Sequence, residues 1–211
     1  MNNQGELIKR SYKFNDIRAT EDNNRAGVEG HAAVFNSKTD IGGWFYEIID
    51  RGAFEGCDFT DVPFLVNHDT KRIPLARSRR NNGSSTMKLG VDHIGLLIKA
   101  DFDIENNSEA RQVYSSIQRG DIDGMSFSFR VADEKWDNLD SDMPTRTILR
   151  ISKVYEVSAV NWPAYSDTDI KARDKSALDN ARQALENARS KELDNSELYI
   201  YKLKNHTLGG M

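Results

Sequence analysis

Short apolar segments, each bounded by Gly, Asn, Asp or Pro, recur along most of this chain and predict a structure rich in β-strands. The segments expected to form strands are Leu7–Phe14, Val28–Phe35, Trp44–Ile49, Val62–Asn67, Met87–Val91, Gly95–Phe102, Met125–Val131 and Thr147–Val160. Strands this short and this numerous favour a closed or strongly curved sheet. Residues 132–146 are acidic and lack a sustained period, so we expect an exposed hairpin or a mobile loop there.

One segment has the period of an α-helix instead. Its apolar residues are spaced at i, i+3, i+4 and i+7, and they are Ala110, Val113, Tyr114 and Ile117. Ser108 precedes them and can cap the start of a helix. Gly120 follows them and can adopt the left-handed conformation that ends many helices. The pattern therefore predicts a helix between these two residues.

Composition divides the chain into three parts. Residues 1–25 are polar and are expected to form a flexible lead-in, residues 26–170 form the folded domain, and residues 171–211 form a helical tail that ends in disorder. In the tail, Ser176 can cap a helix with a narrow, alanine-rich apolar side. That side consists of Leu178, Ala181, Leu185 and Ala188. Such a helix is marginal alone, so we expect a partner surface to complete it.

The overall composition excludes several classes of protein. The chain of 211 residues has 29 Lys and Arg against 33 Asp and Glu, and so lacks the basic excess of nucleic-acid-binding proteins. A single cysteine, Cys57, excludes an internal disulfide and a cysteine-based zinc site. No stretch approaches the ~20 apolar residues of a membrane helix, and the first residues lack an apolar signal core. We therefore expect a soluble protein without nucleic-acid, membrane, metal or cofactor partners.

Polar side chains of types that can take part in catalysis interrupt or end three of the predicted strands. His68 follows an apolar strand and can act as a general base, because imidazole titrates near neutral pH. Ser126 and Ser128 share one face of their strand, and either hydroxyl can be a nucleophile beside a base. Glu156 interrupts an apolar strand, so if buried it needs an arginine or an imidazole as partner. Each of these residues also has a purely structural interpretation.

The four histidines lack a metal-ligand spacing such as His-Glu-x-x-His, which disfavours metal-dependent hydrolysis.

An ordered set of motifs, between about residue 10 and residue 171, resembles the prohead maturation proteases of tailed bacteriophages. The motifs are Gly30–Phe35, Glu47–Phe54, Asn67–Asp69, Gly95-Leu96, Ile117–Phe129 and Glu156–Tyr165. These proteases are similar in fold to herpesvirus assemblins. The resemblance therefore implies an α+β, β-rich fold with a curved or barrel-like, mainly antiparallel sheet surrounded by helices, plus the C-terminal helical tail.

The same resemblance implies a serine endopeptidase that cleaves the scaffold and the capsid precursor inside the immature prohead, in the host cytoplasm. His68 falls on the family's base and Ser126 on its nucleophile. Glu156 fits the third catalytic member by position, and Asp69 is the alternative. Ser128 stands where the family usually has glycine, and so adds a second hydroxyl near the nucleophile. The resemblance also implies a homodimer or higher oligomer that trims its own tail.

A rival interpretation is a noncatalytic scaffold or assembly module of the same fold. In that case the charged C-terminal helix would recruit the major capsid protein, since assembly partners often bind through amphipathic helices. The intact set of His68, Ser126 and Glu156 argues against this alternative.

Overall fold

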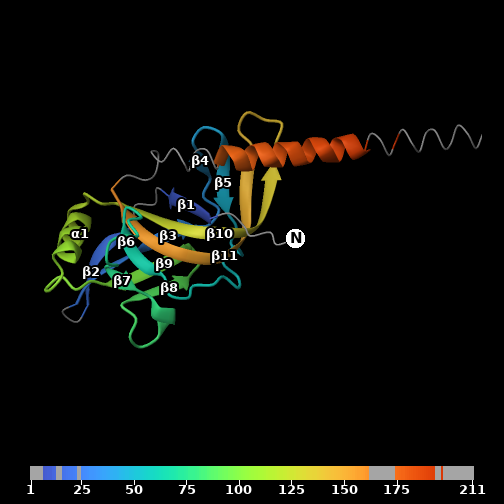
Figure 1. Cartoon of the computed structure of the whole chain (residues 1–211). Helices are drawn as coiled ribbons and strands as arrows, with labels where there is room; N and C mark the ends of the chain where they lie inside the picture. The colour runs from blue at the N-terminus through green and yellow to red at the C-terminus, as the bar shows by residue number, and fades with distance from the viewer. Residues whose placement is uncertain (1–6, 13–15, 23–24, 162–173, 193–195, 197–211) are drawn as a thin grey trace, which may run out of the picture.

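The computed structural model describes residues 7–12, 16–22, 25–161, 174–192 and 196, and within them every strand belongs to one of two sheets (Figure 1). The seven-stranded sheet has the order β1 (Leu7–Tyr12), β10 (Gly124–Asp137), β11 (Thr145–Val160), β5 (Phe45–Ile49) and β4 (Thr39–Ile41), with β6 (Pro63–Val66) paired to β11 and β7 (Ala76–Arg77) paired to β6. The four-stranded sheet has the order β2 (Arg18–Asp22), β3 (Arg25–Val34), β9 (Gly95–Asp101) and β8 (Met87–Val91). All described pairings are antiparallel except those of β11 with β5 and β6 and an isolated bridge.

The two sheets share one hydrophobic core. Phe127 and Phe129 of β10 stack with ring centroids 4.4 Å apart, and Phe64 of β6 meets Phe102 edge-on at 5.3 Å. At Gly30 of β3 the backbone lies so close to Ile17, just before β2, that a Cβ atom on residue 30 would lie 2.8 Å from the Cα of Ile17. A glycine is therefore required at this point for the segment before β2 to pack against β3.

The predicted helix is confirmed as α1 (Ser108–Arg119), although its cap differs from the prediction. Asn107, rather than Ser108, is the N-cap, and its side chain accepts hydrogen bonds from the backbone N–H groups of Glu109 and Ala110. Asparagine and serine are comparable caps, so the spacing alone did not separate two adjacent candidates. Gly120 ends the helix with φ at 78°, as expected from its sequence position.

The acidic segment 132–146 forms the outer part of a long hairpin, so its hairpin alternative is confirmed. β10 and β11 remain paired out to Asp137 and Thr145, so β10 extends well beyond its predicted end at Val131, and β11 begins slightly before its predicted start at Thr147. The extension is stabilised across the strands: Trp136 packs against Phe45 with ring centroids 5.0 Å apart, and Arg146 Nε donates to Glu134 at 2.9 Å. These contacts explain why a segment without apolar periodicity is a strand.

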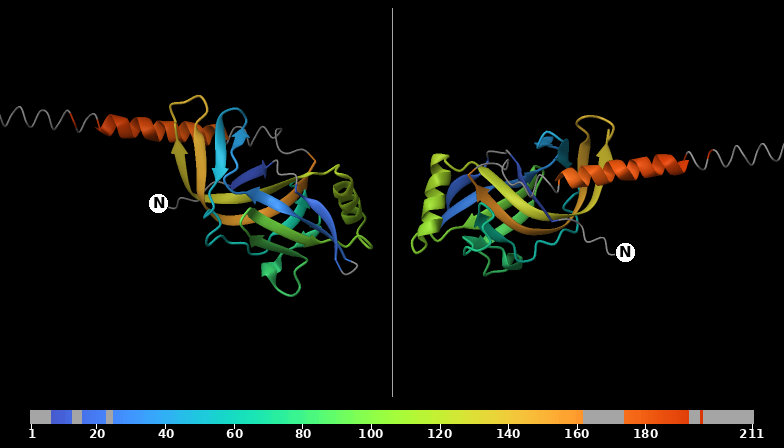
Figure 2. Two further views of the ribbon diagram at one scale, coloured as in Figure 1. Left: turned by 180° about the vertical axis from the view of Figure 1, so that it is seen from behind. Right: turned by 45° about the horizontal axis from the view of Figure 1, so that its top comes forward.

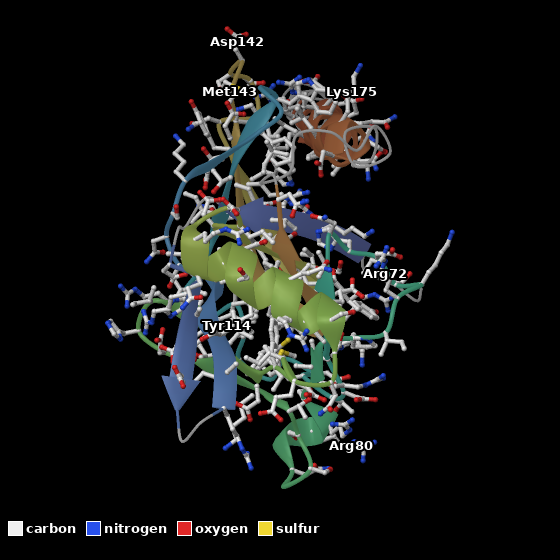
Figure 3. All side chains as sticks on the ribbon, turned by 90° about the vertical axis from the view of Figure 1, so that its left-hand side faces the viewer. Arg72, Arg80, Tyr114, Asp142, Met143 and Lys175 are labelled. Carbon is white, nitrogen blue, oxygen red and sulfur yellow. The ribbon has the colours of Figure 1, made fainter. Side chains whose placement is uncertain are left out.

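Helix 174–192 crosses the end of this hairpin (Figures 1 and 2). It begins before the predicted cap Ser176, and Leu178 is the buried residue of its apolar side. Arg182 donates to the backbone carbonyls of Leu139 and Ser141 in the hairpin turn. In Figure 3, Asp142 and Met143 of this turn lie at the same end of the molecule as Lys175, at the start of the helix. The partner surface expected for this helix is therefore supplied, at least in part, by the same chain.

Two features of the predicted fold differ in the structure. Neither sheet closes into a barrel within the described residues, because β1 and β4 are free edges of one sheet and β2 and β8 are free edges of the other. The sheets are also not surrounded by helices in the described part of the chain, where α1 and helix 174–192 lie at opposite ends (Figure 2). Strand β1 was expected, whereas the short strands β2, β4 and β7 were not.

Two expectations fall on residues outside those that the structure describes, and one concerns membrane-spanning helices. The end of the last family motif, from Trp162 to Tyr165, and the predicted disorder at Gly209–Met211 lie outside the described residues. In the part of the chain that is described, no helix combines the length and the apolar character needed to span a bilayer.

Candidate active site

Four buried polar side chains form a block on one face of the β10–β11 pair. In the antiparallel register Ser126 lies opposite Ser158, and Ser128 lies opposite Glu156. Residues two apart on a strand point to the same face, so all four side chains share it. All four are buried. Met125, Phe127 and Phe129 alternate with the two β10 serines and belong to the hydrophobic core.

His68 reaches this block from a tight turn after β6. β6 pairs in parallel with β11 from Val157 to Ala159, which places its C-terminal end beside the end of β11. The turn is closed by a hydrogen bond from the N–H of Asp69 to the carbonyl of Val66, at 3.0 Å. Its two central residues, Asn67 and His68, have φ values of 50° and 59°. Both therefore adopt the left-handed conformation that non-glycine residues rarely occupy.

The imidazole of His68 contacts the carboxylate of Glu156. Nδ1 lies 2.6 Å from Oε1 of Glu156. Because a carboxylate at neutral pH can only accept, Nδ1 is assigned the proton and Nε2 is left as the basic nitrogen. No hydrogen-bond partner of Nε2 occurs among the residues that the structure describes. The arrangement is that of a general base oriented by an acid.

Glu156 is held in its ionised form. Burial alone would raise the pKa of this carboxyl, but His68 opposes it through a hydrogen bond and its charge, and Ser128 and Ser158 through hydrogen bonds. The net effect lowers the pKa of Glu156 below its usual value. Ser158 Oγ donates to Oε2 at 2.6 Å, and Ser128 Oγ donates to Oε1, the oxygen that also receives His68. A buried carboxylate with this many donors is satisfied without an arginine partner.

The proposed nucleophile and the proposed base are not hydrogen-bonded to each other in this structure. Ser126 Oγ donates to the backbone carbonyl of Arg10 in β1, at 2.8 Å, and the serine is fully buried. The described residues contain no hydrogen bond between Ser126 and His68. The structure thus brings His68 and Ser128 each into contact with Glu156, and holds Ser126 on the same sheet face, opposite Ser158.

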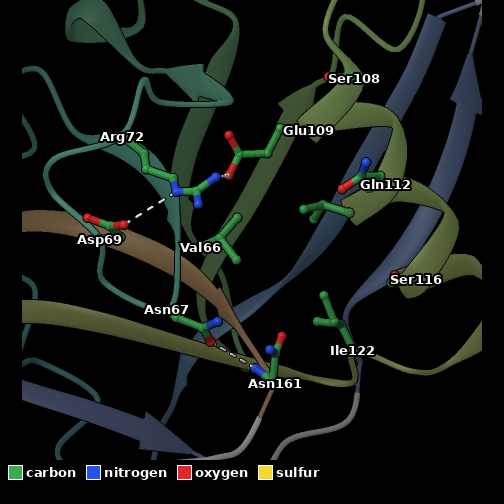
Figure 4. Close-up of a pocket in the computed structure, with 11 residues that line it drawn as sticks. Val66, Asn67, Asp69, Arg72, Ser108, Glu109, Gln112, Ser116, Ile122 and Asn161 are labelled. Carbon is green, nitrogen blue, oxygen red and sulfur yellow. Dashed lines mark hydrogen bonds and ion pairs between the residues drawn. The ribbon is translucent and has the colours of Figure 1, made fainter.

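Asp69, the alternative acid, lies away from the imidazole and faces a groove. Its carboxylate accepts from the N–H of Lys71 and lies 3.4 Å from Nε of Arg72. Arg72 in turn pairs with Glu109 of α1 at 3.2 Å (Figure 4). The groove has a volume of about 610 Å³, and its lining includes both sequence neighbours of His68, Asn67 and Asp69. Its wall is therefore continuous with the turn that carries the base.

The other nucleophile and base candidates are in unsuitable environments. Burial raises the pKa of Cys57 to about 12, helped by the neighbouring charge of Asp58, so its thiol is not ionised at neutral pH. His31 is clamped between two carboxylates, with Nδ1 at Asp16 and Nε2 3.0 Å from Asp92. Both ring nitrogens are therefore engaged. In the described part of the chain, no cluster of three or more His, Cys, Asp or Glu side chains is arranged to hold a metal ion.

Two residues at the site were not identified from the sequence as participants. Ser158 bonds both to Glu156 and to the backbone of His68, and its spacing of two from Glu156 was the available signal. Arg10 supplies the carbonyl that holds Ser126. This contact depends on the pairing of β1 with β10 across more than a hundred residues of sequence, which no local pattern indicates.

Comparison with known proteins identifies the family of the chain. Residues 13–184 match the family described as caudovirus prohead serine protease. Among curated proteins, the prohead protease of Enterobacteria phage HK97 is 28% identical over 172 residues, covering 79% of this chain and 69% of that protein. No solved structure matches the chain. Because the matched range covers most of the sequence, including His68, Ser126 and Glu156, the chain belongs to the caudovirus prohead serine protease family.

Proposed function

We propose that this chain is a serine endopeptidase that cleaves the capsid precursor and the scaffold within the immature prohead of its phage. Family membership supports a peptidase of capsid maturation. The observation that carries the catalytic part is the 2.6 Å contact between His68 Nδ1 and Glu156 Oε1, beside two buried serines of β10. An imidazole held by a carboxylate near a hydroxyl is the arrangement that activates serine for acyl transfer.

In the proposed mechanism Ser126 is the nucleophile, His68 the general base and Glu156 the residue that orients the base. Ser126 rotates away from the carbonyl of Arg10 and gives its proton to Nε2 as its oxygen attacks the peptide carbonyl. His68 then returns the proton to the leaving amine, and a water molecule, activated in the same way, hydrolyses the acyl-enzyme. Glu156 remains ionised and stabilises the imidazolium, consistent with its lowered pKa.

Ser128 is less suited to be the nucleophile. Its hydroxyl donates to Oε1 of Glu156, the same oxygen that faces Nδ1 of His68. It therefore lies on the side of the imidazole that binds the acid, whereas the proton of a nucleophile must pass to Nε2. This argument favours Ser126 by elimination.

The substrate is proposed to reach His68 through the groove beside its turn. Asn67 and Asp69 line this groove on either side of His68, and Asn161 at the end of β11 completes that wall (Figure 4). The opposite wall is α1, through residues such as Glu109 and Gln112. Further parts of the proposal are self-association into a dimer or larger oligomer and removal of the enzyme's own tail.

The experiment that tests the proposal is coexpression of the chain with its cognate capsid precursor, with products identified by mass spectrometry. Wild type should release defined fragments, Ser126→Ala should lose cleavage by several orders of magnitude, and Ser128→Ala should retain it. Full cleavage by Ser126→Ala together with its loss in Ser128→Ala would reassign the nucleophile. Absence of products with wild type, despite binding to the precursor, would favour the noncatalytic assembly module.

A further inference from the structure

The hydroxyl of Ser158 joins two parts of the site that come from different segments of the chain. Its oxygen donates to Oε2 of Glu156 at 2.6 Å and accepts the backbone N–H of His68 at 3.2 Å. Ser158 is fully buried. A hydroxyl has one hydrogen, and here that hydrogen is used for the carboxylate, while a lone pair receives the N–H. One side chain thus fixes the acid and the backbone of the base relative to each other.

The backbone of His68 needs such a restraint. With φ at 59°, it occupies the left-handed conformation, which is sterically unfavourable for a residue other than glycine. Neighbouring bonds tie the same turn to β11: the N–H of Asn67 donates to Ala159, and the N–H of Asn161 donates to the Asn67 side chain. Those two bonds hold Asn67, whereas the bond to Ser158 holds His68 itself.

The carboxylate of Glu156 also needs a restraint, because its two oxygens have different partners. Oε1 faces His68 Nδ1 and Ser128, and Oε2 faces Ser158. Without the bond at Oε2, rotation of the carboxylate about its last side-chain torsion, which is a broad energy well, is less hindered. Ser128 binds Oε1, the same oxygen that His68 binds, so it does not fix the position of Oε2 as the bond from Ser158 does.

From these contacts we propose that Ser158 is a positioning residue of the site: it holds the His68 backbone and the Glu156 carboxylate so that Nδ1 carries the proton and Nε2 faces the nucleophile. The role rests on the proposed function, in which His68 is the base. Ser158 acts only through His68 and Glu156 and does not touch the substrate. Its loss should therefore change the imidazole itself as well as the reaction rate.

The test uses the full chain and three variants. Ser158→Ala removes the hydroxyl, Ser158→Thr restores it, and Ser152→Ala is the matched control. Ser152 lies on the same strand, and its hydroxyl donates to the backbone carbonyl of Arg130, away from His68 and Glu156. Thermal unfolding of each variant establishes that the compared proteins are folded.

The first readout is the ¹⁵N NMR spectrum of the imidazoles at a pH where His68 is neutral, with His68→Gln used to assign its signals. Wild type should show the Nδ1–H tautomer, and Ser158→Ala a mixture of the Nδ1–H and Nε2–H tautomers. Ser158→Thr and Ser152→Ala should resemble wild type. This readout needs no substrate, so it tests the role of Ser158 even if the proposed protease activity is absent.

The second readout is the rate at which diisopropyl fluorophosphate modifies the protein, followed by intact mass. In this reaction the serine oxygen forms a bond to phosphorus, fluoride leaves, and the base takes the hydroxyl proton. Ser158→Ala should react at least about tenfold more slowly than wild type, and Ser158→Thr within a few fold of it. If wild type itself fails to react, the proposed nucleophile is wrong, and the tautomer spectrum alone decides the role of Ser158. An unchanged tautomer in folded Ser158→Ala would overturn the inference, whatever the rate.

Discussion

At the scale of single residues, His68 stands at a position that favours glycine. A turn with positive φ at both central residues, as at Asn67 and His68, is most stable with asparagine followed by glycine. Asn67 fits this preference and His68 does not. The imidazole therefore comes with a less stable backbone conformation, a combination that is common at functional sites.

This conformation predicts a difference between two variants that both lack the imidazole. His68→Gly relieves the left-handed strain and His68→Ala does not, while both lose the same contact with Glu156. We expect the glycine variant to be more stable by about 1 kcal/mol, measured by urea unfolding. Both should be inactive, because neither has a base. Equal stability of the two variants would contradict a left-handed conformation at residue 68.

At the scale of secondary-structure elements, Arg10 links three of them. Its guanidinium donates two hydrogen bonds to Glu47 of β5, at 2.6 and 3.0 Å, and two more to Asp174 at the start of helix 174–192. Glu47 also receives Arg146 of β11 at 3.3 Å. Arg10, Glu47, Arg146 and Asp174 are all buried. The backbone carbonyl of Arg10 accepts the hydrogen bond from the Ser126 hydroxyl. Arg10 therefore connects helix 174–192 to the candidate site.

This buried network predicts that Arg10 contributes far more to stability than an exposed arginine does. Replacing Arg10 with methionine removes two hydrogen bonds from the buried carboxylate of Glu47 and two from that of Asp174, so we expect a loss of about 3–5 kcal/mol in the free energy of unfolding. Arg18→Met is the matched control: Arg18 also lies on a strand and pairs with Glu29, but 63% of its side chain is exposed. Its loss should cost less than about 1 kcal/mol. Similar losses for the two variants would mean that the network is solvated.

The elements that were predicted correctly are those whose pattern lies within their own residues. β8 matches its predicted bounds, Met87–Val91, and α1 has both its apolar period and its terminal Asn and Gly within its own segment. β2, β4 and β7 are short and were not predicted, because they are defined by pairing with a neighbouring strand rather than by their own pattern. The two packed sheets likewise depend on pairing order, which the sequence pattern does not contain.

The same distinction applies to the candidate site. The common face of Ser126 and Ser128 follows from the period of a strand, so it was predictable. The contact of His68 with Glu156 depends on the parallel pairing of β6 with β11, two segments separated by most of the domain. From the sequence, Glu156 was therefore preferred to Asp69 only through its position in the family resemblance. The likeness to herpesvirus assemblins and the roles of the three catalytic candidates stay predictions.

At the scale of the whole molecule, the carboxyl groups set how stability depends on pH. Hydrogen bonds from Lys153 and Thr60 lower the pKa of Asp58 to about 2. Burial opposes the ionisation of Asp92, but hydrogen bonds from Gly95, His31 and Ile94 lower its pKa to about 2. The pKa of Glu156 is lowered as well, whereas burial raises that of Asp174. The groups with lowered values dominate.

A lowered pKa in the folded state means that the unfolded chain binds more protons between the ordinary and the lowered value. The contribution of Asp92 to stability is therefore complete above its ordinary pKa of 3.8 and disappears as the pH falls to about 2. The opposite applies to His31: burial lowers its pKa, but hydrogen bonds and charge from Asp16 and Asp92 outweigh this and raise it above 6.5. The contribution of His31 is present below that value and is lost as the pH rises.

The opposite directions of these pKa shifts predict that the free energy of unfolding is largest between about pH 4 and pH 6.5 and falls on both sides. Urea unfolding across the pH range measures this. Asp92→Asn tests the acid side, because an asparagine oxygen can still accept the N–H groups of Ile94 and Gly95, which hold the turn. The variant should be less stable than wild type at pH 6, and the difference should shrink as the pH falls from 4 towards 2. A difference independent of pH would show that Asp92 stabilises the turn through its shape and hydrogen bonds rather than through its charge.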